Sequence, residues 1–374
     1  MADRSQEFEV SDYAVASADT HLNLVDLTEG TGGFLITDSS KKALGKIMDD
    51  AQTHFELTYR PATETYDGRF HKIEVKLAKA DLRVEARSGY YAVPEEAGAG
   101  LTPVDMAGFR ALNTTPALHA FDYRAAALRF QDASGKPGLA VAMDIPIANL
   151  GRSAAVADAN GKHGVHVSLL AVIKDANRQI VNRFSSDSPM EVTDADLKSG
   201  KVGHVMFEKP VTLDPGHYTL ETAAVDWVAG NASTSVAEFD CVAREGPQIS
   251  SVILVRSVEA AQSPAADDPL VYQGKRIVPA LFTALNADAK PSVFFRVYPD
   301  RKSSSKPRLR AQFVLDGKVI ADQVAELGEV DGSGSIPVLV QAAAKPGNHE
   351  LRLTVMQGDG SARGEIRYTV AAKQ

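Results

Sequence analysis

The segments Leu213–Leu220 (LDPGHYTL) and Ala344–Leu353 (AKPGNHELRL) share a Pro-Gly turn that leads directly into an alternating strand. A Pro-Gly pair marks a turn because proline fixes its own φ and glycine accepts the left-handed backbone. In both cases the turn precedes a late strand in a series of short strands. The echo therefore predicts two units of similar topology, although it is too short to establish a duplication.

The first unit extends from residue 118 to residue 245, where apolar and polar residues alternate with a period of two, as in half-buried strands. One expected strand has these apolar residues on one face: Leu139, Val141, Met143, Ile145 and Ile147. Another, Val165–Ile173, is apolar on both faces because Leu170 and Val172 add to the alternating set. That pattern indicates a central strand. About seven strands fit this segment, which is the size of a small β-sandwich.

The second unit follows Gly246-Pro247 and ends the chain. Its expected strands are Ile249–Val255, Phe294–Tyr298, Ala311–Leu315, Ile336–Val340, Leu351–Val355 and Ile366–Val370. Asp316-Gly317, between Leu315 and Val319, predicts a tight hairpin because both turn residues tolerate positive φ. We therefore expect a second sandwich over residues 246–374.

Residues 19–60 carry a different pattern, of helix, strand, helix and strand. Phe34–Ile36 is a short apolar strand candidate, Leu44–Ala51 has helical spacing, and Phe55–Tyr59 alternates. This order predicts a small α/β part. A hairpin is expected next, with Ile73, Val75 and Leu77 on its buried face and its turn at Ala78–Asp81. A linker over 95–117 follows, with a short helix at Met106–Leu112.

Several motifs of this N-terminal part occur together: Thr31-Gly32-Gly33, Phe55–Pro61, Asp67-Gly68, His71–Val75 and Val84–Tyr91. As a set they resemble the C-terminal part of the von Willebrand factor type A related proteins of the acidobacterial type. The resemblance implies that residues 1–94 are an incomplete type A domain, a remnant of a Rossmann-like sheet. It also implies β-rich domains after it, in an exported or cell-surface system.

A complete type A domain binds a divalent cation through an Asp-x-Ser-x-Ser loop, and hard cations require such oxygen ligands. The nearest matches here are Asp3-Arg-Ser5-Gln-Glu7 and Asp132-Ala-Ser134-Gly-Lys136, each of which lacks the last hydroxyl. We therefore expect the metal-ion-dependent adhesion site to be missing. Half a sheet would expose an apolar edge. We accordingly expect burial against another domain or a second chain for Phe34, Leu44, Ile47, Phe55 and Leu57.

Bulk composition excludes several classes of function. The 374 residues carry 40 basic and 48 acidic side chains, a net charge of −8, which argues against nucleic-acid partners. No run reaches the ~20 apolar residues of a membrane span. The first twenty residues lack the pattern of a signal peptide. The single cysteine, Cys241, excludes an internal disulfide, and its apolar neighbours predict a buried structural thiol.

Candidate sites of other kinds each have a simpler structural interpretation. His163 and His166 have the wrong spacing for a shared metal on a strand, so an exposed turn is favoured. Trp227 and Tyr218 suggest a sugar platform, although burial in the sandwich core is favoured. Two further sets remain. The acidic Asp194, Asp196, Asp267 and Asp268 could bind calcium, although a capped helical turn is favoured at Thr193–Asp196 and a loop at Asp267-Asp268; the basic Arg301–Arg308 is interpreted as a hairpin tip.

The sequence thus predicts a mainly β protein with a small α/β part: a truncated type A (Rossmann-like) remnant plus hairpin (1–94), a linker (95–117) and two immunoglobulin-like β-sandwiches (118–245 and 246–374). We expect a non-catalytic protein-interaction or scaffold protein, with no catalytic, cofactor or metal residues. Its expected partner is a protein, with self-association through the remnant. The alternatives are a carbohydrate-binding sandwich protein and a hydrolase with an unrecognised site. The resemblance favours the periplasm or the cell surface, whereas the missing signal peptide leaves the cytoplasm open.

Overall fold

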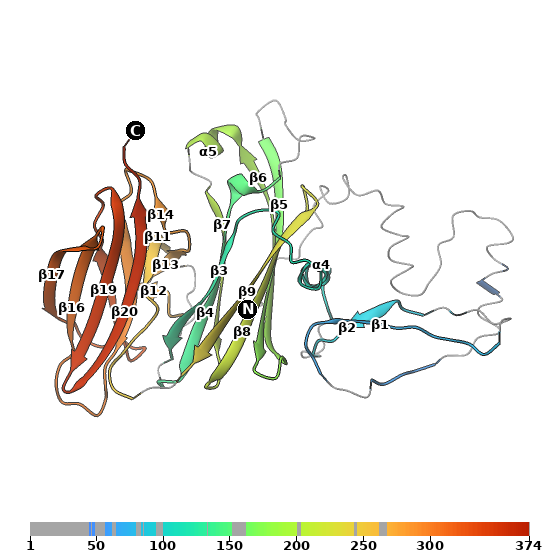
Figure 1. Cartoon of the computed structure of the whole chain (residues 1–374), viewed down its shortest axis with the longest axis horizontal. Coiled ribbons are helices and arrows are strands. Elements are labelled where there is room, and N and C mark those ends of the chain that lie inside the picture. The colour runs from blue at the N-terminus through green and yellow to red at the C-terminus, as the bar shows by residue number, and fades with distance from the viewer. Residues whose placement is uncertain are drawn as a thin grey trace, which may run out of the picture.

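The computed structural model describes residues 45, 47–48, 57–61, 65–79, 84, 86–94, 100–132, 134–151, 162–199, 203–242, 245–261 and 268–373. Two β-sandwiches follow one another in the chain (Figure 1). Sandwich 1 lies within residues 118–242 and sandwich 2 within residues 245–373. None of the described helices is long and apolar enough to cross a membrane.

Sandwich 1 consists of two antiparallel sheets. The first has the order β3 (Arg124–Gln131), β4 (Pro137–Pro146) and β7 (His204–Thr212). The second has the order β6 (Ile180–Thr193), β5 (Lys162–Asp175), β8 (Gly216–Asp226) and β9 (Asn231–Cys241). The short helices η1 (Ile147–Asn149) and α5 (Asp194–Ser199) follow β4 and β6, where the chain changes sheets. This division of seven strands is that of an immunoglobulin-like sandwich, and it confirms the expected strand number.

The core of sandwich 1 lies between these sheets. The alternating residues of β4 and β5 supply much of it, among them Leu139, Val141, Met143, Ile145, Val165, Val167, Leu169, Ala171 and Ile173. Each of these side chains is at most 2% exposed. The expected strand faces are therefore confirmed. β5 also pairs with both β6 and β8, which confirms its central position.

β5 is buried on its second face because helix α4 (Pro103–Leu112) covers it. A capping box starts this helix: Thr102 Oγ1 accepts from Asp105 N (3.1 Å), and Asp105 Oδ2 accepts from Thr102 N (2.8 Å). Gly108 allows the close approach, since a Cβ there would lie 2.5 Å from the Cβ of Leu170. The helix expected near residues 106–112 is confirmed, and it covers the sheet.

The N-terminal hairpin forms only at its open end. β1 (Phe70–Lys72) pairs antiparallel with β2 (Gly89–Tyr91), while the expected turn at Ala78–Asp81 lies partly outside the described residues. Val75 and Leu77 are nevertheless 39% and 40% exposed, so the expected buried face is wrong. No second sheet covers that face in the described part of the chain, and a lone hairpin has no core of its own.

The α/β remnant is not confirmed. Ile47 and Leu57 are 44% and 80% exposed, so their expected burial is wrong, and residues 57–59, expected within a strand, are irregular. No neighbouring strand of the described chain completes their hydrogen bonds, which explains the lack of a strand. Phe34, Leu44 and Phe55 lie outside the described residues.

Sandwich 2 also has two sheets. In the first, β15 (Ser292–Tyr298) pairs on one side with β18 (Ile336–Gln341). On its other side, β15 pairs with β10 (Gln248–Ile249) and with β11 (Ile253–Ala260). β11 then pairs with β13 (Lys275–Ala280), and β13 pairs with β12 (Val271–Tyr272). The second sheet has the order β14 (Ala284–Leu285), β20 (Gly360–Val370), β19 (Gly347–Gln357), β16 (Arg308–Leu315) and β17 (Lys318–Glu326).

The expected hairpin at Asp316-Gly317 is confirmed. Both residues have positive φ, 46° and 79°, and they connect β16 to β17. The expected strands of sandwich 2 are present, although Ile249–Val255 is divided between β10 and β11, and β19 and β20 begin earlier than predicted. β12, β13 and β14 were not predicted.

The two Pro-Gly turns form equivalent corners in the two sandwiches. Tyr218, at the start of β8, donates its hydroxyl to the carbonyl oxygen of Asp214 (2.8 Å) and stacks on Phe239. At the same place in β19, His349 Nε2 contacts the carbonyl oxygen of Lys345 (2.6 Å), and its ring stacks on that of Tyr368. The echo in the sequence thus corresponds to one repeated structural device. It also fixes Tyr218 as a corner residue of sandwich 1, only 7% exposed.

We expect Tyr218→Phe to lower the free energy of unfolding by about 1 kcal/mol, because the change leaves a carbonyl oxygen without its hydrogen bond. Urea denaturation measures this value. Tyr66→Phe, at a 40% exposed ring, is the control and is expected to change nothing measurable. Equal effects of the two substitutions would contradict the role of the corner.

Candidate functional site

The largest shared feature of the two sandwiches is a buried apolar junction. The outer face of β3 and β4 contacts β11, β13 and β15 there through Leu128, Phe130, Ala140, Ala142, Ile253, Leu270, Ile277 and Phe294. All eight side chains are at most 7% exposed. An interface of this apolar kind restrains relative domain motion. From sandwich 2, β11 contributes Ile253, β13 contributes Ile277 and β15 contributes Phe294.

Asp144 lies at the edge of this junction and is fully buried. Its Oδ2 accepts from Arg256 Nη2 (2.6 Å) and from the backbone N of Leu281 (3.0 Å), both in sandwich 2. Its Oδ1 bonds to Nδ1 of His204 in sandwich 1. Burial alone would raise the pKa of Asp144, but the His204 hydrogen bond and the Arg256 charge together hold that pKa below 3.8. The carboxylate therefore joins the sandwiches in its ionised form.

A second ion pair crosses the junction nearby. Glu208 Oε2, on β7, accepts from both Nη2 (2.7 Å) and Nε (3.2 Å) of Arg276, on β13. Burial raises the pKa of Glu208 above 4.5 against the opposing effect of Arg276, and the charges of Asp268 and Glu259 raise it further. Glu208 Oε1 is buried without a hydrogen-bond partner. Both side chains line a cavity of about 740 Å³ between β7, β11 and β13.

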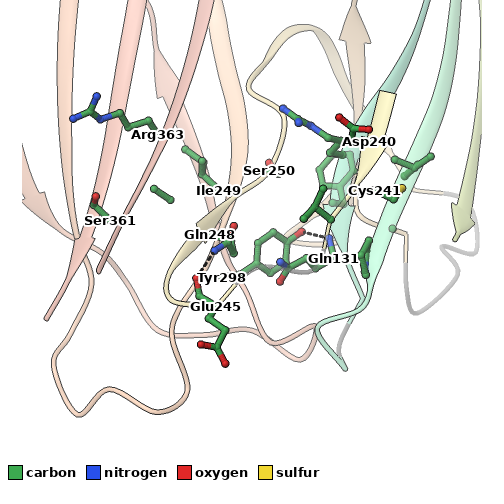
Figure 2. Close-up of a pocket in the computed structure, with 17 residues that line it drawn as sticks. Gln131, Asp240, Cys241, Glu245, Gln248, Ile249, Ser250, Tyr298, Ser361 and Arg363 are labelled. Carbon is green, nitrogen blue, oxygen red and sulfur yellow. Dashed lines mark hydrogen bonds between the residues drawn. The ribbon is translucent and has the colours of Figure 1, made fainter. Parts of the chain in front are cut away.

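A smaller cavity of about 350 Å³ lies at the other end of the junction (Figure 2). Tyr298 accepts from the backbone N of Gln131 (3.0 Å), which again joins the two sandwiches. Burial raises the pKa of Tyr298 to about 12 and that of the Cys241 thiol above 9.0. A thiol with a raised pKa is a poor nucleophile, and Cys241 is 3% exposed, so the expected structural thiol is confirmed.

The histidine and tryptophan predictions need correction. His166 lies in β5, not in an exposed turn, where its Nε2 bonds to Asp187 Oδ1 (2.8 Å). Trp227 is 45% exposed, so its expected burial is wrong. It follows β8 in a turn, where its Nε1 donates to Ser168 Oγ (2.6 Å) and its ring stacks on His166. The turn takes the indole out of the core and holds it at the surface.

These four residues are not arranged for nucleophilic catalysis. Ser168 donates its hydroxyl to Asp187 Oδ1, the same oxygen that His166 binds. A Ser-His-Asp triad instead requires the histidine to bond to the serine hydroxyl. Burial would raise the pKa of Asp187, but the hydrogen bonds from His166 and Ser168 lower it below 3.8. The arrangement therefore positions Trp227.

The remaining candidates stay apart. Asp196 N donates to Thr193 Oγ1 (3.1 Å), so this segment is the expected capped helical turn. Asp268 caps residue 270 in sandwich 2, and Asp267 is outside the described residues. Within the described ranges no three His, Cys, Asp or Glu side chains are grouped for a metal ion. In the basic loop, Lys302 pairs with Glu245 (3.0 Å).

In comparisons with known proteins, no family model and no curated protein matches this chain. Among solved structures, it is similar to the fibronectin(III)-like modules of Clostridium thermocellum CbhA, at 13% identity and a TM-score of 0.19, over 67% of this chain and 95% of that one. A two-domain fibronectin type III segment of chicken tenascin shows 8% identity and a TM-score of 0.19, over 67% and 98%. The dimeric latent PorU of Porphyromonas gingivalis shows 12% identity and a TM-score of 0.27, and the match covers 67% of this chain and 20% of that one.

Scores this low say nothing about ligands or partners. The immunoglobulin-like assignment therefore rests on the sheet orders of the two sandwiches and on their matching corners.

Proposed function

We propose that this chain is a non-catalytic interaction or scaffold protein whose two sandwiches form one rigid body. The apolar junction carries this proposal, because it fixes the distance and angle at which the outer surfaces of the two sandwiches face their partners. The resemblance noted in the sequence extends the proposal to an exported or cell-surface system.

The side-chain chemistry supports a non-catalytic role. Cys241 is buried with a raised pKa, and Ser168 and His166 share one carboxylate oxygen instead of bonding to each other. The carboxylates Asp144 and Glu208 are both paired with arginines that join the sandwiches. The ion pairs of these two carboxylates therefore hold the sandwiches together.

Distance measurements between two spin labels test the rigid-body proposal. Glu238→Cys and Asp359→Cys place one label on each sandwich at exposed positions, while Cys241 is too buried to react. We expect a single narrow distance distribution. A broad distribution, as from domains on a flexible linker, would overturn the proposal.

The exposed Trp227 favours a second candidate function, carbohydrate binding. A rigid, half-exposed indole beside the ionised Asp187 offers a stacking face and a hydrogen-bond acceptor to a sugar. On a glycan array, we expect any glycan that binds to be lost in Trp227→Ala and retained in Val236→Ala, a control at another exposed apolar residue of sandwich 1. No binding, or equal binding by both variants, would rule out this candidate.

A further inference from the structure

β17 is an edge strand of unusual exposure. It pairs with β16 alone, and among the described residues no segment bonds to its free side. Eight of its nine positions are exposed, including Val319 (52%), Ile320 (48%) and Val324 (50%). Figure 1 shows it as the outermost strand, at the end of the molecule opposite β1 and β2. A long apolar edge of this kind is a template for another strand.

Most other long edges of the two sandwiches are protected. The exception is β20, which β14 pairs only at Thr369 and Val370, but only five of its eleven positions are exposed. β6, β7, β13 and β18 each contain a proline, respectively Pro189, Pro210, Pro279 and Pro337. A proline removes a donor from the free side and discourages pairing. β9 is bonded over its first half by residues 118–120, and β3 is bonded by Ser251. β17 has neither protection.

The charges on β17 suit an antiparallel copy of itself. Lys318 stands at one end and Glu326 at the other, so antiparallel pairing about a two-fold axis near Asp322 brings unlike charges together at both ends. Parallel pairing would bring like charges together. Asp322 at the centre is already neutralised by the fork of Arg310 (2.9 and 2.6 Å). The pairing with β16 shifts register only near the turn and is regular from Ala321 to Glu326.

We propose that two copies of this chain associate through β17, whose free edges pair antiparallel to join two five-stranded sheets into one. This rests on the proposed scaffold function for its role and gives that scaffold a partner, a second copy. The surface differs from residues 1–94, through which the sequence predicts self-association. A single strand pair is small for an interface, so we expect a dissociation constant on the order of 100 µM.

Sedimentation velocity of the full chain, from about 10 to about 500 µM, tests this proposal. We expect a dimer to appear with rising concentration. Lys318→Glu and Glu326→Lys should each weaken it about tenfold, because each places like charges together twice, and the double variant should restore it. Circular dichroism checks that each variant remains folded.

Three outcomes would overturn the proposal: a monomer over the whole range, a dimer indifferent to the charge changes, or a dimer lost in Val236→Lys. The last would place the contact on β9, the partly covered edge of sandwich 1. A monomer with a narrow spin-label distance would refute the pairing and leave the rigid scaffold standing. A dimer with a broad spin-label distance distribution would support the β17 pairing and refute the rigid scaffold.

Discussion

Phe294→Ala is expected to uncouple the two sandwiches, whereas Phe295→Ala is expected to weaken sandwich 2 and leave the junction closed. The two residues are neighbours on β15, and both are fully buried. Phe294 belongs to the junction core and Phe295 to the core of sandwich 2. Each truncation removes a ring and leaves a cavity, which costs about 3–5 kcal/mol.

The matched pair separates loss of coupling from loss of stability. We expect the spin-label distance to broaden in Phe294→Ala and to stay narrow in Phe295→Ala under conditions where both remain folded. Similar distance distributions in the two variants would show that the junction is not held by Phe294.

Asp144→Ala is expected to lower the free energy of unfolding by about 3 kcal/mol. The change leaves the charge of Arg256 and the backbone N–H of Leu281 without their buried acceptor, and breaking a buried pair in this way is costly. Urea denaturation at neutral pH measures the loss. Asp322→Ala, which removes the partner of an exposed arginine, is the control and is expected to leave the urea midpoint unchanged within error.

The same carboxylate sets a direction for the pH dependence. The pKa of Asp144 in the folded protein is below its ordinary value of 3.8. The carboxylate therefore stabilises the fold fully at pH values above 3.8, and this stabilisation is lost as the pH falls through the lowered pKa of the folded protein. We therefore expect the difference in stability between the native protein and Asp144→Ala to shrink in acid, below about pH 4. A difference independent of pH would show that the carboxylate is not ionised in the folded state.

Strand alternation predicted both sandwiches, and the Pro-Gly echo predicted that the two have similar topology. These signals are local, since each depends on residues adjacent in the chain. The N-terminal α/β prediction depended on periodicity, and its interpretation as a type A remnant depended on a resemblance; the described residues Ile47 and Leu57 are exposed instead of buried. Periodicity cannot show whether a neighbouring element is present to cover an apolar face.

The junction could not be predicted because its residues come from distant segments. Asp144 faces away from the core of sandwich 1, so alternation assigns it to solvent, yet Arg256 and Leu281 cover it from sandwich 2. In β13, charged residues such as Arg276 face sandwich 1 instead of solvent. The usual alternation of apolar buried and polar exposed residues is therefore missing from this strand. Trp227 was misplaced because a large aromatic ring favours burial, while the turn after β8 holds it at the surface.

Trp227 offers the most direct test of the central claim, because it is the chain's one tryptophan and it reports on sandwich 1 alone. Its fluorescence and the far-ultraviolet circular dichroism, which reports on both sandwiches, are to be followed through one urea titration. If the junction makes the sandwiches one cooperative unit, the two transitions coincide. Two separate midpoints would contradict the account.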